Sequence, residues 1–439
     1  MKNFTVAILG CGTVGSGVAK ILLDRKTMLA DRSSHSIELK KIVDLFPAKS
    51  AQKYDLPLSL FCGGGKDLTR EEASSYIAEV INDDGIDLVV ETIGGTSEYL
   101  LSVMLGALGA KKHLVTANKA MLAEKGDRIF AAAKENNVTL GYEASVCGAI
   151  PIIKAIRECF TGDEVREISG IMNGTSNYIL SRMEHDGLDF HTALSLAQEA
   201  GYAEADPTLD ISGGDAAHKL LILMKLAFGA DVRHGDLLKT GIQHIAKEDI
   251  DFANEMDCSI KLICHAKKSD GKIFAAVMPM MVHHDNFLSK VHGATNCVEV
   301  RNAYSGTHYF IGAGAGSLET ASAIVGDIVF AARYRAEVEN IPVSTAQELV
   351  DADHFEFPYN ITFSTDDRPG ITGLITSAIG EQEINIDTVS HNRHSKKNAV
   401  FSVVTMPCTL HQIKNAVAVI KKQAPGLLAE EPKVIPILH

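Results

Sequence analysis

The 439-residue sequence predicts an α/β protein with a doubly wound parallel sheet, followed by an α+β domain and a small C-terminal domain. Two observations lead to this fold class. Short β-rich runs alternate with helical segments over residues 4–144, and a strand–helix–strand–strand–helix–strand rhythm begins near Pro358. A chain of this length also exceeds what one compact core usually holds, so two or three domains are expected.

The first region, residues 1–150, carries the clearest alternation. Helical patterns such as VGSGVAKILLD separate its β-rich runs, and this arrangement is typical of βαβ units with parallel strands. The expected strands are residues 4–9, 37–43, 86–92, 113–117 and 138–143.

After Pro151 the pattern changes to strands with interspersed helices, and we expect an α+β domain over residues 151–311 for substrate binding and dimerisation. A glycine-rich turn then opens an apolar helix, so residues of about 312–340 are expected to pack back near the first region. The amphipathic pattern lapses at 341–357, which indicates a linker. The last segment, 358–439, has the size of a ferredoxin-like domain.

Composition and charge argue against several partners. The net charge of −13, without a basic stripe, makes nucleic-acid binding unexpected. The eight cysteines show no C-x-x-C pair and no zinc-ligand spacing. The apolar run 220–228 is too short to cross a bilayer, and MKNFTVAILG does not resemble a signal peptide. We therefore expect a cytoplasmic protein with neither nucleic-acid nor membrane partners.

A glycine-rich loop predicts the cofactor. Gly10, Gly12 and Gly15 form a G-x-G-x-x-G pattern directly after a strand and directly before a helix. That context is typical of a Rossmann-type dinucleotide site, in which the pyrophosphate meets the helix N-terminus. Asp44 ends the second strand, where an acid would bind the ribose hydroxyls of NAD. Three nearby lysines could instead bind the 2′-phosphate of NADP, so both cofactors stay open: Lys40, Lys41 and Lys49.

A charged pair stands on an apolar helix face. Asp215 and Lys219 are four residues apart at the start of the predicted helix, and Ile222, Leu223 and Leu226 continue the same face. One interpretation is a half-exposed pair that stabilises the helix start. The other is a catalytic lysine that a carboxylate holds at the mouth of a pocket.

Several stretches resemble the homoserine dehydrogenase family. They are the glycine loop, VTANKAML (115–122), GYEASVCGAIPII (141–153), GIMNGTSNYIL (170–180) and AGYAEADPTLDISGGDAAHK (200–219). The resemblance implies the NAD(P)-dependent interconversion of L-homoserine and L-aspartate 4-semialdehyde, in the biosynthesis of threonine, isoleucine and methionine. It also implies a homodimer or homotetramer.

The resemblance further implies roles for single residues. Lys219 should donate the proton that the aldehyde oxygen needs as hydride arrives, and Asp215 should hold its ammonium group. Lys119 is a second candidate for proton transfer, although it could also be a structural helix-start lysine. Asp210 should order the reacting hydroxyl, and Glu204 should bind the substrate's ammonium group. The other expected substrate contacts are Gly174, Thr175 and Tyr202. The expected cofactor contacts are Gly10, Gly12, Thr13, Val14, Gly15, Asp44, Thr92, Thr116, Lys119 and Gly312.

The loop before Pro151 matches a family site for sodium or potassium. The expected ligands are Glu143 and the backbone at Val146, Gly148 and Ile150; a purely structural turn is the alternative. Cys147 stands where the family usually has glycine, and Glu319 stands where proline is expected. A rival hypothesis makes Cys147 the nucleophile of a thioester-forming aldehyde oxidation. A second rival is a catalytically inactive amino-acid sensor.

The C-terminal segment resembles the ACT domain. Its signature is Asp367-Arg368-Pro369-Gly370, followed by Ile384-Asn385-Ile386. Free backbone amides at that helix start would suit an amino-acid carboxylate. We therefore expect inhibition by L-threonine, and an active but insensitive enzyme after deletion from about residue 350. The alternative is a dimerisation module without a ligand.

Overall fold

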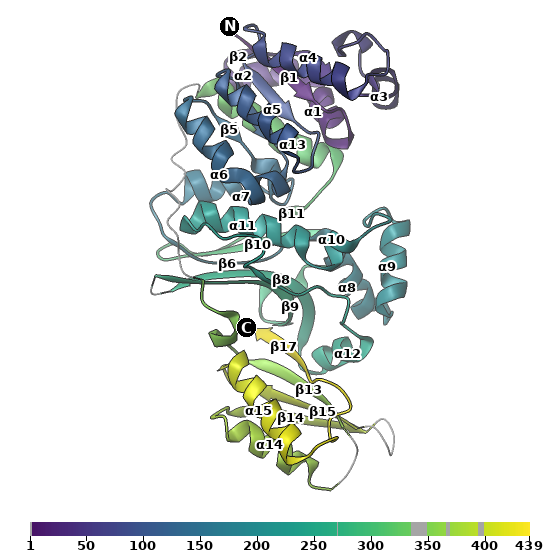
Figure 1. Cartoon of the computed structure of the whole chain (residues 1–439), viewed down its shortest axis with the longest axis vertical. Coiled ribbons are helices and arrows are strands. Elements are labelled where there is room, and N and C mark those ends of the chain that lie inside the picture. The colour runs from purple at the N-terminus through teal and green to yellow at the C-terminus, as the bar shows by residue number, and fades with distance from the viewer. Residues whose placement is uncertain (1, 270, 335–348, 366–368, 394–398) are drawn as a thin grey trace. The chain divides into compact units, whose positions relative to one another are not determined.

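A computed structural model describes residues 2–269, 271–334, 349–365, 369–393 and 399–439 (Figure 1). The chain forms two compact units. Unit 1 comprises Met1–Arg166, Asp215–Asp236 and Thr295–Ala346, and unit 2 comprises Glu167–Gly214, Leu237–Ala294 and Gln347–His439. The predicted middle domain, 151–311, is therefore divided between the two units.

The core of unit 1 is a parallel sheet with the strand order β2-β1-β3-β4-β5. All five strands expected from the sequence are in this sheet, and the last three are shorter than expected. Because β1 lies between β2 and β3, the strand order reverses there, and ligands bind outside the carboxyl ends of the strands at such a point. The strands are Lys2–Leu9 (β1), His35–Val43 (β2), Leu88–Glu91 (β3), His113–Thr116 (β4) and Leu140–Gly141 (β5).

Helix α13, Ser317–Arg333, packs with α1, Thr13–Asp24, on this sheet. A Cβ atom on Gly17 would lie 2.8 Å from the Ser317 carbonyl oxygen, so glycine lets the two helices approach closely. The expected return segment thus lies in unit 1, although residues 335–340 are outside the described part. The other elements of unit 1 are Lys26–Ser33 (α2), Pro47–Tyr54 (α3), Arg70–Asn82 (α4), Glu98–Gly109 (α5), Lys119–Glu135 (α6), Ile152–Lys154 (α7), Gly214–Phe228 (α11), Thr295–Asn302 (β10) and Gly306–Ala313 (β11).

Unit 2 contains one mixed sheet with the order β6-β8-β9-β17-β13-β15-β14, and β7 pairs with β9. Its strands are Val165–Ile171 (β6), Leu238–Lys239 (β7), Cys258–Ser269 (β8), Lys272–His283 (β9), Tyr359–Thr365 (β13), Ile386–Arg393 (β14), Ala399–Thr405 (β15) and Lys433–Leu438 (β17). Its helices are Gly174–Asp186 (α8), Phe190–Glu199 (α9), Thr208–Ile211 (α10), Lys247–Glu255 (α12), Ile371–Gly380 (α14) and Leu410–Gln423 (α15).

The C-terminal segment has the predicted βαββαβ order, and α14 packs against α15 (Figure 1). Its last strand, β17, has two neighbours. It pairs with β13 antiparallel, with Ile435 opposite Asn360, and with β9 parallel, with Ile437 opposite Met281. The segment therefore continues the sheet of unit 2, whereas the sequence predicted a domain separated by a linker.

The described part of the expected linker, residues 349–357, is packed on the same sheet. Val350 donates its amide to the Ile273 carbonyl of β9 at 2.8 Å. Phe355 stacks on Phe274 with ring centroids 3.9 Å apart. The short strand β12, Glu356–Phe357, pairs with β16, Cys408–Thr409. Residues 341–348 of the expected linker lie outside the described residues.

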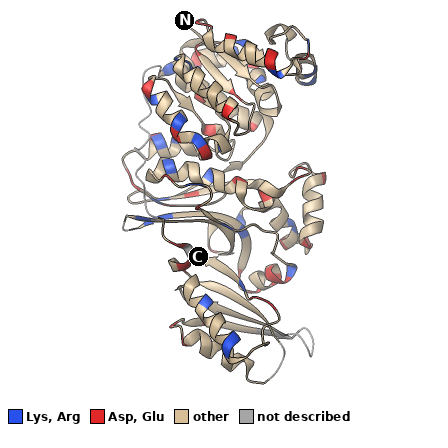
Figure 2. Cartoon of the chain, viewed as in Figure 1, with Lys and Arg blue, Asp and Glu red and all other residues tan. Residues whose placement is uncertain are grey.

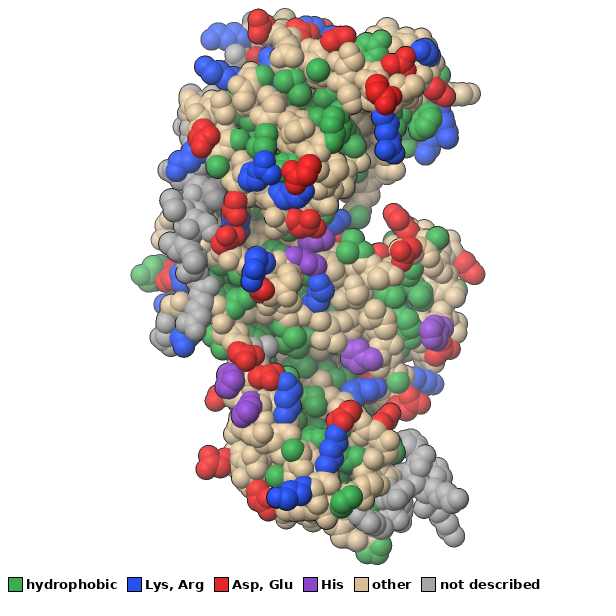
Figure 3. Space-filling model, in the orientation of Figure 1, with side chains coloured by type: hydrophobic (Ala, Val, Ile, Leu, Met, Phe, Trp, Pro, Cys, Tyr) green, Lys and Arg blue, Asp and Glu red, His purple; other side chains and the backbone are tan. Residues whose placement is uncertain are grey.

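Acidic and basic residues are interspersed along the described elements (Figure 2). The face drawn in Figure 3 shows the same mixture of the two signs. Among the described residues, no helix combines the length and the apolar character needed to cross a bilayer.

Candidate active site

The glycine loop leaves space where a cofactor phosphate would approach. Gly10 has a φ of +91°, which favours glycine, and its amide donates to the Val43 carbonyl of β2 at 2.8 Å. A Cβ atom on Gly15 would collide with the Gly10 carbonyl, whereas a Cβ on Gly12 would have no neighbour within 4 Å. Helix α1 then begins at Thr13 without an acidic residue in its first turn. The loop therefore offers open space and a positive helix end to a pyrophosphate.

Asp44 holds this loop in place. Its Oδ2 accepts the Cys11 amide at 2.8 Å, and its Oδ1 accepts the Phe46 amide at 2.9 Å and the Ser50 hydroxyl at 3.0 Å. Burial, together with the Asp44 charge, raises the pKa of the Cys11 thiol to about 12. A carboxylate offers roughly four acceptor positions, and three of them are used here by the protein. Asp44 thus has a structural role that its position at a strand end did not reveal.

The ends of β3 and β4 are joined by a buried acid, Glu91, that is not among the predicted site residues. Glu91 is fully buried, and it accepts the amides of Ile93 and Gly94 at 2.8 and 2.9 Å and the Thr116 hydroxyl at 2.6 Å. The Thr92 hydroxyl donates to the Gly10 carbonyl at 2.7 Å. Thr92 and Thr116, which were predicted to contact the cofactor, therefore have protein partners. An acid directly after the apolar run LVV was the signal that could have identified Glu91.

Asp215 links two lysines. Its Oδ2 lies 2.8 Å from Lys219 Nζ, and its Oδ1 lies 2.9 Å from Lys119 Nζ. Asp215 and Lys219 are 4% and 6% exposed, which contradicts the interpretation of a half-exposed helix-start pair. Burial alone would raise the pKa of Asp215, but the charges and hydrogen bonds of the two lysines outweigh it and hold the pKa well below its usual range. We call Lys119, Asp215 and Lys219 the lysine–aspartate cluster.

Lys119 reaches this cluster from a different part of the chain. It is the first residue of α6, and Asn118 caps that helix by accepting the Met121 amide at 3.1 Å. Its side chain is 36% exposed, whereas that of Lys219 is 8% exposed. The ammonium group of Lys219 is thus enclosed, whereas that of Lys119 is partly exposed to solvent.

Cys147 lies buried in the loop before Pro151. Its φ of +53° is uncommon for a residue with a side chain, and a glycine would adopt it without strain. The Asn296 amide donates to its Sγ at 3.4 Å. Burial raises the pKa of the thiol, although Lys219 counteracts this in part. A thiolate is therefore disfavoured, which argues against the thioester hypothesis.

Glu143, the expected cation ligand, contacts the start of α7. Its two carboxylate oxygens accept the amides of Ile153 and Lys154 at 2.8 and 2.9 Å. Burial, and then the nearby Asp327 charge, raises the pKa of Glu143 to about 7. The Ile150 carbonyl accepts the Ile152 amide at 2.8 Å. These contacts are structural, and the cation site stays a prediction.

A second set of predicted residues meets in unit 2, at the start of α8. Asn173 caps this helix by accepting the Ser176 amide at 2.7 Å, and its own amide donates to Asp210 Oδ1 at 2.7 Å. The Thr175 hydroxyl donates to the Tyr202 carbonyl at 2.6 Å. Asn173 was not predicted, although an asparagine before a helix-starting glycine is a recognisable cap signal.

Two further predicted residues, Glu204 and Gly312, lie outside the lysine–aspartate cluster and the contacts at the start of α8. The Glu204 carbonyl accepts the Gln198 side-chain amide at 3.1 Å, and the Glu204 side chain is exposed. Gly312 pairs with Asn296 in the β10–β11 hairpin, and a Cβ atom on it would lie 3.2 Å from Ile150. Gly312 therefore contacts the loop before Pro151.

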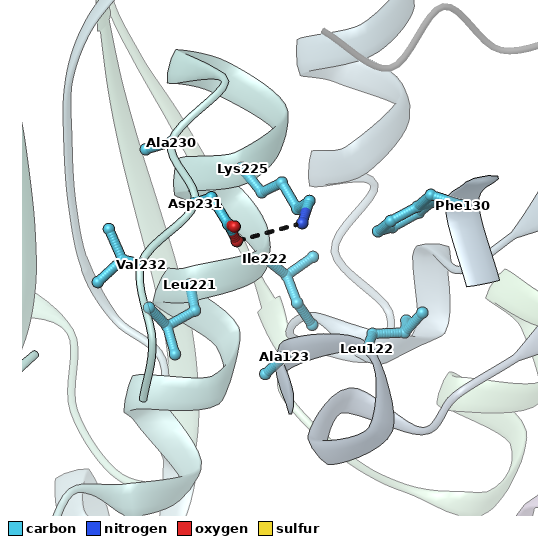
Figure 4. A pocket seen from close by; sticks show the side chains of 9 residues that line it. All are labelled: Leu122, Ala123, Phe130, Leu221, Ile222, Lys225, Ala230, Asp231 and Val232. Atoms are coloured by element: carbon cyan, nitrogen blue, oxygen red, sulfur yellow. Dashed lines mark ion pairs between the residues drawn. The ribbon is translucent and has the colours of Figure 1, made fainter. Parts of the chain in front are cut away.

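A small cavity on α11 does not fit a cofactor or a substrate. Its volume of about 20 Å³ is enough for about one water molecule. Lys225 Nζ lies 3.5 Å from Asp231 at its edge (Figure 4) and also pairs with Asp127. Its lining residues are Leu122, Ala123, Phe130, Leu221, Ile222, Lys225, Ala230, Asp231 and Val232.

Comparison with known proteins gives one consistent result. The sequence profile "Homoserine dehydrogenase, NAD binding domain" matches residues 10–143, and "Homoserine dehydrogenase" matches residues 151–329. The homoserine dehydrogenase of Helicobacter pylori is 37% identical over 406 residues, which cover 90% of each chain. The enzyme of Neisseria gonorrhoeae is 35% identical over 96% of each chain.

Solved structures agree with these sequence matches. A crystal structure of homoserine dehydrogenase from Thiobacillus denitrificans has a TM-score of 0.90 at 33% identity, covering 100% of this chain and 99% of that chain. A hyperthermophilic archaeal homoserine dehydrogenase in complex with NADPH has a TM-score of 0.63 at 25% identity, covering 77% of this chain and 100% of that chain. This chain belongs to the homoserine dehydrogenase family, and it is an oxidoreductase with a domain that binds a nicotinamide cofactor.

Proposed function

We propose that the chain interconverts L-homoserine and L-aspartate 4-semialdehyde, and that Lys219 transfers the proton at the reacting oxygen. The contact between the buried residues Lys219 and Asp215 is the observation that carries this proposal. An enclosed ammonium group that a carboxylate holds in one orientation is suited to donate a proton to a developing alkoxide. This reaction would serve the biosynthesis of threonine, isoleucine and methionine.

Each member of the cluster has a separate task in this proposal. NAD(P)H supplies the hydride when it is bound, and Lys219 gives its proton to the aldehyde oxygen. Asp215 cannot be the acid, because its low pKa keeps the carboxyl group ionised. We assign Lys119 to proton exchange with solvent, since its side chain is the more exposed of the two lysines. In the reverse direction Lys219 accepts the hydroxyl proton.

We assign substrate binding to the residues around the start of α8. Asp210, which Asn173 holds at 2.7 Å, would order the reacting hydroxyl. The exposed carboxylate of Glu204 would bind the substrate's ammonium group. Gly174, Thr175 and Tyr202 would shape the pocket, and the hydrogen bond from Thr175 to the Tyr202 carbonyl supports their proximity.

For the cofactor we propose the glycine loop with Thr13 and Val14, and with Asp44 near the ribose. One unused acceptor position on Asp44 is compatible with a ribose hydroxyl of NAD. NADP stays open, since lysines 40, 41 and 49 lie nearby in sequence. A sodium or potassium ion at Glu143, Val146, Gly148 and Ile150 is retained as a proposal. Left-handed backbone at Cys147 and Gly148, with φ of 53° and 44°, gives this loop a tight turn.

We also propose that the C-terminal βαββαβ segment is an ACT domain that binds L-threonine. Its support is the strand order β17-β13-β15-β14 and the left-handed Gly370 at the start of α14, with a φ of 92°. Asp367 and Arg368 of the signature lie outside the described residues. Since β17 pairs with β9, bound threonine would act on the rest of unit 2 through a shared sheet.

The shared sheet changes how this regulation should be tested. Deletion from residue 350 would remove β17 and leave β9 without a neighbour along part of its edge. We therefore no longer expect the truncated chain to stay fully active. The full-length protein should instead be assayed with L-threonine and with D-threonine as control. If neither L-threonine nor D-threonine inhibits the enzyme, and neither changes its melting temperature, the proposal that the domain binds threonine is contradicted.

We further propose a cytoplasmic homodimer or homotetramer that assembles through unit 2. All eight cysteines are free thiols, which suits a reducing compartment. Size-exclusion chromatography with light scattering would give the number of subunits.

One assay tests the proposed reaction. The full-length protein should oxidise NADH or NADPH only when L-aspartate 4-semialdehyde is present. Comparison of the two cofactors also gives the preference between them. Absence of turnover with both cofactors, in protein with a cooperative melting transition, would refute the proposal.

A further inference from the structure

A group of metal-ligating side chains lies at the far end of α8 from the proposed substrate contacts. The ligand atoms of Glu184, His185 and His292 all lie within 4.8 Å of one another. His185 Nε2 and His292 Nδ1 are 3.1 Å apart. With zinc–nitrogen bonds of about 2.0–2.1 Å, two ligands of a tetrahedral zinc ion lie roughly 3.3 Å apart, so the two histidines nearly match this spacing.

The carboxylate of Glu184 has one oxygen that forms an ion pair at 3.8 Å but accepts no hydrogen bond from the described residues. Its side chain is 9% exposed. Oε1 accepts the Ser259 hydroxyl at 2.6 Å, and that hydroxyl also lies 3.3 Å from His284 Nε2. Oε2 is buried and makes no hydrogen bond among the described residues. A buried carboxylate oxygen without a hydrogen bond is costly, and Lys261 at 3.8 Å compensates its charge without filling its acceptor positions.

The segment that carries His292 is fixed to its surroundings. The Val291 carbonyl accepts the Asn177 side-chain amide at 3.1 Å and Lys261 Nζ at 3.0 Å. The Gly293 amide donates to the Ser181 hydroxyl of α8 at 3.1 Å. These three bonds hold His292 beside His185, so binding a metal would order little additional chain.

The charges around these ligands favour the binding of a divalent cation with moderate affinity. Glu184 and His185 lie in the last turn of α8, where the helix dipole is negative, and Gly187 ends the helix with a φ of 66°. Lys261 opposes a cation, since its Nζ lies 3.8 Å from Glu184 Oε2. That distance is too long for a hydrogen bond, so Oε2 is ion-paired with Lys261 but keeps its lone pairs for a metal ion.

We propose that Glu184, His185 and His292 bind one late first-row divalent metal ion, with zinc as the best match. Two imidazoles and one carboxylate suit zinc, cobalt or nickel better than magnesium, and water would complete the tetrahedron. The ion would join the end of α8 to the 291–293 segment and so stabilise unit 2. The proposal does not depend on the reaction that the enzyme catalyses.

Calorimetric titration of the full-length, tag-free, chelator-treated protein with zinc chloride tests this site. We expect one ion per chain, and binding at least about tenfold weaker in His185→Ala and in His292→Ala. His191→Ala removes an exposed histidine of α9 and Cys159→Ser removes an exposed thiol, and both should bind zinc like the unaltered protein. Magnesium chloride should give no heat of binding.

The melting temperature gives an independent readout. Zinc should raise it by about 2–4 °C in the unaltered protein and in His191→Ala, and should leave it unchanged in His185→Ala. Without metal, His185→Ala should melt like the unaltered protein, because His185 is exposed. Absence of zinc binding in the unaltered protein would overturn the proposal, and so would zinc affinities of His185→Ala and His292→Ala that equal the affinity of the unaltered protein.

Discussion

Asp44 and Asp215 were both predicted to be functional carboxylates, and their partners in the structure differ in kind. Asp44 accepts two backbone amides and one hydroxyl, and it holds the glycine loop beside β2. Asp215 contacts the ammonium groups of Lys119 and Lys219. The difference teaches that an acid at the expected position can have a mainly structural role, and that its acceptor positions must be counted before it is assigned to a ligand.

The largest effect on activity is expected at Lys219, the buried lysine that contacts Asp215. Lys219→Ala should lower kcat by about a hundredfold or more while cofactor binding survives, because the proton donor is lost. Lys225→Ala is the matched control, since this lysine lies on the same helix and pairs with Asp231. Steady-state kinetics and cofactor titration by fluorescence would measure both. A near-normal kcat in Lys219→Ala would show that Lys219 is not the proton donor.

The second effect concerns stability and pH. Asp215→Asn should destabilise the protein by about 3 kcal/mol at pH 7, because two ammonium groups lose their counter-charge. The folded-state pKa of Asp215 lies below its ordinary value of 3.8, so its contribution is present above about pH 4 and is lost as the pH falls further.

The difference in melting temperature between the unaltered protein and Asp215→Asn should therefore be largest near neutral pH and should shrink below about pH 4. A difference that stays constant down to the lowest pH at which both proteins fold would contradict the ion-pair explanation.

The third effect separates a structural threonine from a cofactor contact. Thr116→Val should destabilise the protein by about 2 kcal/mol, because Glu91 and the Asn118 amide each lose a buried partner. The KM for the cofactor should stay nearly constant. A large rise in KM without loss of stability would show instead that Thr116 contacts the cofactor.

The smallest effect is expected at Asp44. Asp44→Ala should raise the KM for NADH by about tenfold and the KM for NADPH by less, since the carboxylate would repel a 2′-phosphate. Asp44→Asn keeps an acceptor for the loop but removes the charge, and thereby separates the two roles. Equal losses with both cofactors, together with a lower melting temperature, would make Asp44 purely structural.

Local patterns in the sequence were enough to predict much of this molecule. The alternation of β-rich runs and helical segments predicted all five strands of the parallel sheet, because each strand and helix has its own hydrophobic period. The glycine spacing predicted the loop after β1, since backbone conformation at Gly10 and packing at Gly15 are local constraints. The four-residue separation of Asp215 and Lys219 likewise predicted their contact on one helix face.

Only the tertiary structure decided which distant groups meet. Lys119 is 96 positions from Asp215, Asn173 is 37 positions from Asp210, and Glu91 contacts a hydroxyl 25 positions away. The strand β17 joins β9 to β13, although the sequence suggested a separate domain. Such contacts depend on how sheets and helices pack, and a strand's pattern does not reveal its neighbours, because many pairings bury the same apolar face equally well.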